Sequence, residues 1–409
     1  MHAFPIEWVR SQFPSLELSM DGRPASFLDA PGGTQVPIAV TRAVRDYYRK
    51  NNSNIGGQFV TSRNTAKMVQ ETRIALAEFV HAIRPEEIVF GQNMTSLTFA
   101  LSRALARTWN PESEIIVTSL DHDANISPWK LAAADRGCSV KTWEMRPEDC
   151  TLRLEDLRAL ISERTALIAV TLASNAVGSH VEVANVVEMI RGANAKVFVD
   201  AVHFAPHGRI DVQALGCDFL VCSAYKFFGP HIGVLWGKYQ WLDTLEAYKV
   251  RPSSVFPPDK WETGTQNFEG IAGTAGALNY LKEAGYRANG SRGIDGAMAA
   301  IQEYESHLSQ RFLNHLTELK RATLFGLSDP DQTKHRTPTF AIRLEGIHPD
   351  EAAEKLANRG IFVWSGNFYA ADLIDRLGLT ASGGVLRLGF THYHTVEEVD
   401  RALNALATL

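Results

Sequence analysis

Apolar runs rich in β-branched residues alternate with stretches of helical periodicity between about residues 60 and 240. The helical spacing predicts helices at 64–82, 96–109, 128–136 and 183–193, and the apolar runs predict strands at 114–119, 166–171, 196–200 and 218–223. These strands are apolar on both faces, which is typical of a mostly parallel sheet that helices cover on both sides. The pattern therefore predicts a large α/β domain, which we place at residues 16–270.

The rest of the chain follows a different pattern. Residues 238–267 are rich in Trp, Pro, Gly and Thr, and we expect them to be irregular. Beyond them the pattern predicts a long helix from 293 past 319, strands at 339–344 and 385–390, a helix at 349–358, a short apolar run at 361–364 and a final helix from Thr395. We expect a smaller α+β domain formed by residues 1–15 and 271–409.

Composition narrows the class of protein. The chain has 409 residues and a net charge of −5, which argues against a general nucleic-acid binder. It has no run of about 18 apolar residues, so we expect no membrane-spanning helix, and its first residues lack a signal-peptide pattern. Four cysteines without a CxxC pair predict neither a disulfide framework nor a zinc site. These features favour a cytoplasmic enzyme.

Polar residues gather where the predicted strands end, and ligands of open α/β sheets bind at those ends. Asp200 ends one apolar strand, and Lys226 follows the next one. Pyridoxal phosphate chemistry needs such a pair, because a lysine amine forms a Schiff base with the cofactor and a carboxylate keeps the pyridine nitrogen protonated. For this pair alone, a helix-capping Asp200 and a solvated Lys226 remain the alternative.

Several further motifs occur in the order found in a known family. The chain resembles pyridoxal-phosphate-dependent fold-type I enzymes of the class V aminotransferase group, and cysteine desulfurase-like proteins in particular. The resemblance covers nearly the whole chain and implies a mostly parallel, seven-stranded type of sheet between helices. It rests on residues 27–33 (FLDAPGG), 121–129 (DHDANISPW), 173–178 (ASNAVG), 198–203 (FVDAVH), 223–230 (SAYKFFGP) and 262–267 (ETGTQN).

The resemblance implies a role for each matching residue. Lys226 would hold the cofactor as an internal aldimine and act as the base, and Asp200 would pair with the pyridinium nitrogen. His122 would stack on the cofactor ring and move protons. Asn175 would bind the phenolic oxygen, with His203 facing the same oxygen. Without the resemblance, the alternatives are a structural hydrogen-bonding role for His122 and a turn position for Asn175.

The phosphate site is predicted at the start of the helix that follows residue 91. Free N–H groups and the helix dipole favour an anion there, and we choose Asn93, Met94 and Thr95, with help from the Ser223 hydroxyl. The alternative is a simple N-cap by Thr95. Tyr225 stands where many desulfurases have a histidine, and its hydroxyl would take over that phosphate contact. Thr265 and Gln266 match a segment that reaches the partner subunit's phosphate, which implies a homodimer with composite active sites.

The substrate would be a small amino acid. Arg387 matches the arginine that holds the substrate carboxylate, for which a planar guanidinium is well suited. Gly32 and Gly33 would let the backbone approach the substrate closely. The alternative for Arg387 is a surface ion pair on an edge strand.

The match fails at one point. Desulfurases receive sulfur on a cysteine of the small domain, but the corresponding residues 360–369 (GIFVWSGNFY) contain no cysteine, and Cys222 is expected to be a buried structural thiol. The spacing of His203 and His207 could seat a metal on a helix, but Pro206 and Gly208 break that helix, so we expect no metal.

We therefore predict a pyridoxal-phosphate enzyme that breaks a C–S bond by β-elimination after its substrate joins the cofactor as an external aldimine. The alternatives are an aminotransferase, a racemase or epimerase of the same fold, and a degenerate family member that binds the cofactor without turnover.

Overall fold

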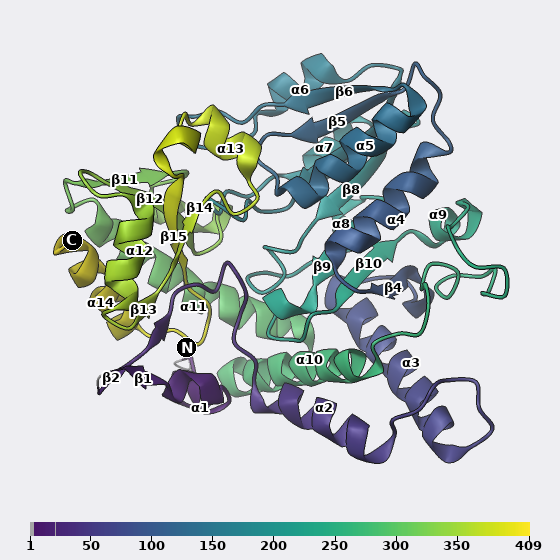
Figure 1. The fold of residues 1–409 in the computed structure, drawn as a ribbon, viewed down its shortest axis with the longest axis horizontal. Helices are drawn as coiled ribbons and strands as arrows, with labels where there is room; N and C mark the ends of the chain where they lie inside the picture. Colours follow the sequence, from purple (N-terminus) through teal and green to yellow (C-terminus); the bar gives the residue numbers. More distant parts are fainter. Residues whose placement is uncertain (1–3, 21) are drawn as a thin grey trace.

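The structure, a computed structural model, describes residues 4–20 and 22–409. A seven-stranded sheet with the order β4-β10-β9-β8-β7-β5-β6 forms its centre (Figure 1). β10 is antiparallel to both of its neighbours, and the other adjacent pairs are parallel. This confirms the predicted mostly parallel α/β sheet. The strands are β4 Ile88–Gly91, β5 Glu114–Thr118, β6 Ser139–Trp143, β7 Thr165–Thr171, β8 Lys196–Asp200, β9 Phe219–Ser223 and β10 Gly233–Gly237.

Both faces of this sheet are covered, as the doubly apolar strands require. Along β8, Val197 and Val199 join the core on one face and Phe198 joins the core on the other. The first face is covered by α3 Val60–Val80, α6 Leu154–Leu160, α7 Val183–Met189, α8 Val212–Leu215 and α10 Phe268–Asn289, and α2 Ile38–Lys50 packs on α10. The second is covered by α4 Met94–Ala106, α5 Ser127–Arg136 and α9 Tyr239–Thr244.

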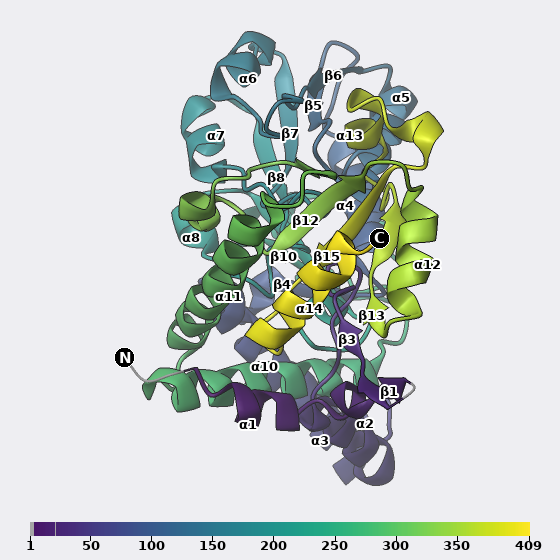
Figure 2. The same ribbon diagram turned by 90° about the vertical axis from the view of Figure 1, so that its left-hand side faces the viewer.

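A second, antiparallel sheet with the order β11-β12-β15-β14 lies beside the first in Figure 1, and its strands β12 and β15 lie in front of the first sheet in Figure 2. Phe312, Phe340 and Phe390 pack against one another in its core with tilted and edge-to-face rings, between strands and helices. The strands are β11 Ala322–Phe325, β12 Thr339–Leu344, β14 Trp364–Gly366 and β15 Val385–Gly389. The helices are α11 Ile294–Leu316, α12 Pro349–Ala357, α13 Ala371–Arg376 and α14 Val396–Ala407.

The apolar run at 361–364 divides between two sheets. Its first half, β13 Ile361–Phe362, pairs in parallel with β3 Ser26–Phe27 near the start of the chain. Its last residue, Trp364, begins β14, which pairs with β15. The remaining short elements are α1 Ile6–Ser11, β1 Ser19–Met20, β2 Arg23–Pro24 and the 3₁₀ turns η1 Pro14–Glu17, η2 Pro85–Glu87, η3 Asp123–Asn125, η4 Ala224–Lys226, η5 Pro330–His335 and η6 Thr380–Ser382.

Three predictions about local structure were wrong. The helix expected to run from 293 past 319 ends at Leu316. The helix expected to reach residue 193 ends at Met189, and Gly192 follows with a left-handed φ of 86° that a helix cannot accommodate. The segment 238–267, expected to be irregular, contains α9, because Trp241 and Leu242 pack onto the covered face of the sheet. Within residues 4–20 and 22–409, no helix combines the length and apolar character that crossing a bilayer requires.

Candidate active site

A cavity of about 300 Å³ lies where the carboxyl ends of β5, β7, β8 and β9 face residues of β14 and β15. Many of the residues predicted from the sequence line it, so the fold brings together side chains from segments far apart in the chain. The predicted residues in its lining are Gly32, Met94, Thr95, His122, Asn175, Asp200, His203, Tyr225, Lys226 and Arg387.

Lys226 and Asp200 reach this cavity from neighbouring parallel strands. Asp200 is the last residue of β8, and Lys226 lies in the η4 turn directly after β9. Both side chains are buried, and the Lys226 ammonium donates to the Pro31 carbonyl. Burial, assisted by the Arg387 charge, lowers the pKa of Lys226 to about 7, and burial raises the pKa of Asp200 to about 6. The lysine is therefore available as a neutral amine near neutral pH.

His122 follows β5 and is held in one tautomer. Its Nδ1 accepts a hydrogen bond of 3.0 Å from the Ala124 backbone, so the proton of the neutral ring lies on Nε2. Burial lowers the pKa of His122 to about 4, which keeps the ring neutral. The ring of Tyr369 stacks on it with centroids 5.3 Å apart.

Asp121 anchors the segment that carries His122. Its carboxylate accepts hydrogen bonds from the Thr118 hydroxyl, from the Asn125 amide at 2.6 Å and from the Thr171 backbone at 3.1 Å. It is fully buried and joins the ends of β5 and β7. The position of His122 therefore depends on a polar network beneath it.

The first turn of α4 faces the cavity with its N-terminus. Asn93 caps the helix by accepting from the Ser96 backbone, and the Ser223 hydroxyl accepts from the Met94 backbone at 3.2 Å. Met94 and Thr95 line the cavity, whereas Asn93 and Ser223 support the helix end behind them. A helix N-terminus at this place offers N–H groups and a positive dipole to an anion.

Arg387 closes the cavity from β15. One of its NH groups donates to the Asn175 carbonyl at 2.8 Å, and its guanidinium carbon lies 4.0 Å from the centroid of the Phe368 ring. Burial lowers the pKa of Arg387 to about 9. Within the described part of the chain, the buried Arg387 Nε and Asn175 Oδ1 find no hydrogen-bond partner. Such atoms are costly to leave unpaired, which fits a bound polar ligand.

His203 is oriented by two threonines at the start of β12. Its Nε2 lies 2.9 Å from the Thr339 hydroxyl and 3.2 Å from the Thr337 hydroxyl. His207, four residues later, instead pairs with Glu305 through Nδ1 at 2.8 Å. The two histidines therefore have separate partners, and no group of three or more candidate ligands for a metal occurs among the described residues.

Besides Asn93 and Ser223, which support the end of α4, three further predicted residues lie outside the lining: Gly33, Thr265 and Gln266. A Cβ on Gly33 would lie 3.3 Å from the Tyr225 ring, so this glycine allows that ring to pack closely. Thr265 and Gln266 lie in a loop, where the Gln266 amide donates only to the Gly264 carbonyl. The sequence did not predict the aromatic residues of the lining, Trp364, Phe368 and Tyr369, although they lie in residues 360–369, which correspond to the cysteine-bearing loop of desulfurases.

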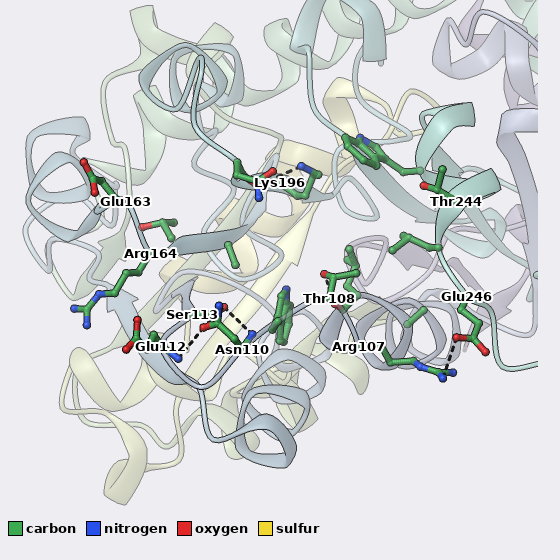
Figure 3. A pocket seen from close by; sticks show the side chains of 18 residues that line it. Arg107, Thr108, Asn110, Glu112, Ser113, Glu163, Arg164, Lys196, Thr244 and Glu246 are labelled. Carbon is green, nitrogen blue, oxygen red and sulfur yellow. Dashed lines mark hydrogen bonds and ion pairs between the residues drawn. The ribbon is translucent and has the colours of Figure 1, made fainter.

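A larger cavity of about 740 Å³ opens at the amino ends of β5, β7 and β8 (Figure 3). Lys196 packs there over the Trp241 ring at 4.1 Å, and Arg107 forms an ion pair with Glu246 at 2.9 Å. None of the residues predicted from the sequence lines it. Its position, away from the carboxyl ends of the strands, makes the smaller cavity the candidate active site.

The fold and the lining of the smaller cavity define the class of protein. A mostly parallel sheet between helices, with a smaller sheet closing over a buried lysine and aspartate, is the architecture of pyridoxal-phosphate-dependent enzymes of fold type I. The family profile described as "Aminotransferase class-V" matches residues 26–402. The chain belongs to the class-V aminotransferase family.

Within this family, the chain is similar to cysteine desulfurases. A cysteine desulfurase of Dickeya dadantii (strain 3937) is 31% identical, over 98% of this chain and 96% of the relative. A probable cysteine desulfurase of Halalkalibacterium halodurans is also 31% identical, over 97% of this chain and 96% of the relative.

Among solved structures, the cysteine desulfurase of Thermococcus onnurineus NA1 superposes with a TM-score of 0.89 at 26% identity, covering 100% of this chain and 98% of that one. The cysteine desulfurase CsdA of Escherichia coli gives 0.84 at 26% identity, covering 99% and 98%. The predicted family and fold are confirmed, and the family uses pyridoxal 5′-phosphate.

Proposed function

We propose that this protein is a pyridoxal-phosphate-dependent enzyme that breaks the carbon–sulfur bond of a cysteine-like amino acid by β-elimination. The observation that carries the proposal is that Lys226, Asp200 and Arg387 line one cavity. They are the three groups this chemistry needs: an amine for the cofactor, a carboxylate for its ring nitrogen and a cation for the substrate carboxylate. The names of the relatives support the same reaction class.

The cavity residues fit the cofactor. When bound, pyridoxal phosphate supplies an aldehyde for covalent attachment and a ring that accepts electrons from the substrate. Lys226 would hold it and later take the proton from the substrate Cα, for which an amine with a pKa near 7 is suited. Asp200 would hold the proton on the ring nitrogen, and the first turn of α4 would bind the phosphate with Thr95 and Tyr225.

The remaining polar groups would orient the ring and the substrate. His122, neutral and with Nε2 protonated, would pack on the ring face. Asn175 and His203 would approach its ring oxygen. Arg387 Nε, which has no partner among the described residues, would bind the substrate carboxylate.

We further propose that sulfur leaves without passing through a cysteine of this chain. Residues 360–369, which match the cysteine-bearing loop of desulfurases, contain none. Cys222 is buried in β9, and burial raises the pKa of its thiol, so it makes a poor nucleophile. Among the described residues that line the cavity there is no cysteine.

Enzymes of this family are typically homodimers, and we propose that this chain is one. Thr265 is exposed and Gln266 half-buried on a loop outside their own subunit's cavity, which suits residues that reach a partner's site. Size-exclusion chromatography with light scattering tests this, and a monomer that binds the cofactor at full affinity would overturn it. The cytoplasmic location stays a prediction.

Purified protein loaded with pyridoxal phosphate tests the function. We expect a visible absorbance band that is lost in Lys226→Ala, and pyruvate formation from cysteine-type substrates that persists when all four cysteines are replaced by serine. Keto-acid formation with amino-group transfer, or inversion at Cα, would instead establish an aminotransferase or a racemase. A band that no amino acid perturbs would indicate a protein that binds the cofactor without turnover.

A further inference from the structure

The cavity offers one cation for a carboxylate and none for a charged side chain. Lys226 and Arg387 are the cationic side chains of its described lining. Under the proposed function, Lys226 holds the cofactor and Arg387 binds the substrate carboxylate. His122 cannot replace them, because burial lowers its pKa to about 4 and keeps it neutral. A substrate with a negatively charged side chain would find no further lysine or arginine in the described lining to pair with that charge.

The side of the cavity that belongs to β14 and the loop after it is aromatic instead. Trp364, Phe368 and Tyr369 all contribute to the lining. Trp364 is 54% exposed and Tyr369 is 70% exposed, so both rings stand where the cavity opens to solvent. A substrate whose carboxylate lies at Arg387 would extend its side chain along these rings.

These rings are held in place by the backbone. The Phe368 carbonyl accepts from the Asn175 amide at 2.9 Å, and the Tyr369 carbonyl accepts from the Asp123 backbone at 2.7 Å. Both aromatic residues adopt left-handed backbone angles, with φ of 55° and 58°, a conformation that non-glycine residues keep only where their surroundings impose it. The aromatic wall is therefore built into the site.

Two of the three rings also contact side chains that have roles in the proposed reaction. Phe368 lies 4.0 Å from the guanidinium carbon of Arg387, and Tyr369 stacks on His122. Trp364 packs against Gly32, where a Cβ would lie 2.7 Å from the indole nitrogen. Any larger residue at 32 would displace the indole, so the glycine and the tryptophan form one surface.

We infer that this site selects amino acids with an uncharged, apolar side chain and that its substrates are S-alkyl or S-aryl thioethers of cysteine. The inference rests on the proposed function for the C–S cleavage, while the selectivity rests on the cavity alone. Thioether sulfur and apolar groups gain favourable contacts with aromatic rings. In the reaction the Cα–H and Cβ–S bonds break, the sulfur leaves with a proton as a thiol, and water converts the remainder to pyruvate and ammonium.

Two readouts on the cofactor-loaded protein test selectivity and function separately. Spectral titration gives the affinity for S-benzyl-L-cysteine, S-methyl-L-cysteine, L-cysteine and L-cysteine sulfinate, and pyruvate formation gives turnover. We expect the tightest binding and highest kcat/KM for S-benzyl-L-cysteine and the weakest for the sulfinate. Tighter binding of the sulfinate or of free cysteine would overturn the inference while leaving C–S cleavage intact. Selective binding of thioethers without pyruvate would support the selectivity and refute the thioether lyase.

Variants locate the selectivity in the aromatic wall. Tyr369→Ala and Trp364→Ala should each weaken S-benzyl-L-cysteine binding about fivefold relative to S-methyl-L-cysteine, as expected for losing one aromatic contact. The ratio between the two ligands cancels any general damage from the lost stacking on His122. Tyr286→Ala, which removes an exposed ring of α10 outside the cavity, is the matched control and should leave the ratio unchanged. An unchanged ratio in both wall variants would overturn the inference.

Discussion

The hydroxyl of Thr339 lies 2.9 Å from Nε2 of His203, and this contact determines which ring nitrogen carries the proton. Burial holds the pKa of His203 well below its usual value, so the ring has a single proton. The Thr339 hydroxyl has no other acceptor among the described residues, so it donates to Nε2. The proton then lies on Nδ1. This atom has no hydrogen-bond partner among the described residues and stays accessible from the cavity. His203 thus presents an N–H donor to the cavity.

Thr339→Val should remove this control over the His203 tautomer. Nε2 would become protonated and donate to Thr337, and Nδ1 would turn from donor to acceptor. If Nδ1–H binds the cofactor's ring oxygen, the loss of one neutral hydrogen bond, about 1 kcal/mol, weakens cofactor affinity roughly fivefold. The pH titration of the cofactor's visible band should shift as well. Thr339→Ser keeps the hydroxyl and should restore both, whereas equal behaviour of the two variants would refute the tautomer argument.

Capture of the cofactor should depend on pH through Lys226. Only the neutral amine attacks an aldehyde, and burial lowers the pKa of Lys226 to about 7. Below that value the rate at which cofactor-free protein develops the visible band should fall about tenfold per pH unit, and above it the rate should level off. Stopped-flow absorbance from pH 5.5 to 9 measures this dependence.

The phosphate of the cofactor also titrates, near pH 6, and needs a control. Arg387 contributes to the lowered pKa of Lys226. Arg387→Leu should therefore move the midpoint of the rate profile to higher pH, while the phosphate itself stays the same. If the midpoint is the same in Arg387→Leu as in the parent protein, the pH dependence comes from titration of the cofactor and not of Lys226.

The central strands were predictable because each is a compact apolar run between polar segments. Strands β8 and β12 have the boundaries that the pattern predicts, 196–200 and 339–344. The edge region was not predicted. β4 has four residues and its partner β10 lies more than 100 residues further along the chain, while β10 itself begins and ends with glycine.

Helix α10 was missed for a different reason. Its first turns contain Gly270, Gly273 and Gly276, which disfavour a helix in isolation. In the fold they allow close contact: a Cβ on Gly276 would lie 2.7 Å from the Ala39 carbonyl of α2. Tertiary packing therefore overrides local preference at this helix.

Some residues of the candidate site could be predicted from the sequence, and others could not. Asp200 and Lys226 could be predicted because polar residues at the ends of apolar strands share one edge of a parallel sheet. Thr337 and Thr339 could not, since they contact His203 across more than 130 residues and no local pattern marks them.

Asp121 should be essential for the stability of the cavity floor. Asp121→Ala would leave the Thr118 hydroxyl, the Asn125 amide and the Thr171 N–H without their acceptor. Unpaired buried donors cost about 1–3 kcal/mol each, and with partial relaxation we expect a loss of about 3 kcal/mol in the free energy of unfolding. Urea denaturation measures it. Asp135→Ala, an exposed aspartate of α5, is the control, and equal stabilities of the two variants would contradict the network's role.

His392 should make stability fall with acid. It is fully buried, its Nε2 lies 2.7 Å from the Tyr280 hydroxyl, and burial lowers its pKa from 6.5 to about 3. The unfolded chain therefore binds a proton at this residue below pH 6.5 that the folded chain does not, and the folded state loses about 1.4 kcal/mol per pH unit between 6.5 and about 3.

Other buried groups also titrate in this pH range. The contribution of His392 is therefore measured as the difference in the free energy of unfolding between the parent protein and a variant at this residue. His392→Gln removes the titration while keeping a polar side chain near Tyr280. The variant should be less stable than the parent at pH 7.5, because the buried contacts of the ring are lost. That deficit should shrink by about 1.4 kcal/mol at pH 5.5, one unit below the unfolded pKa of 6.5. Urea unfolding at the two pH values checks it, and a deficit that is the same at both would show that His392 is protonated in the folded protein.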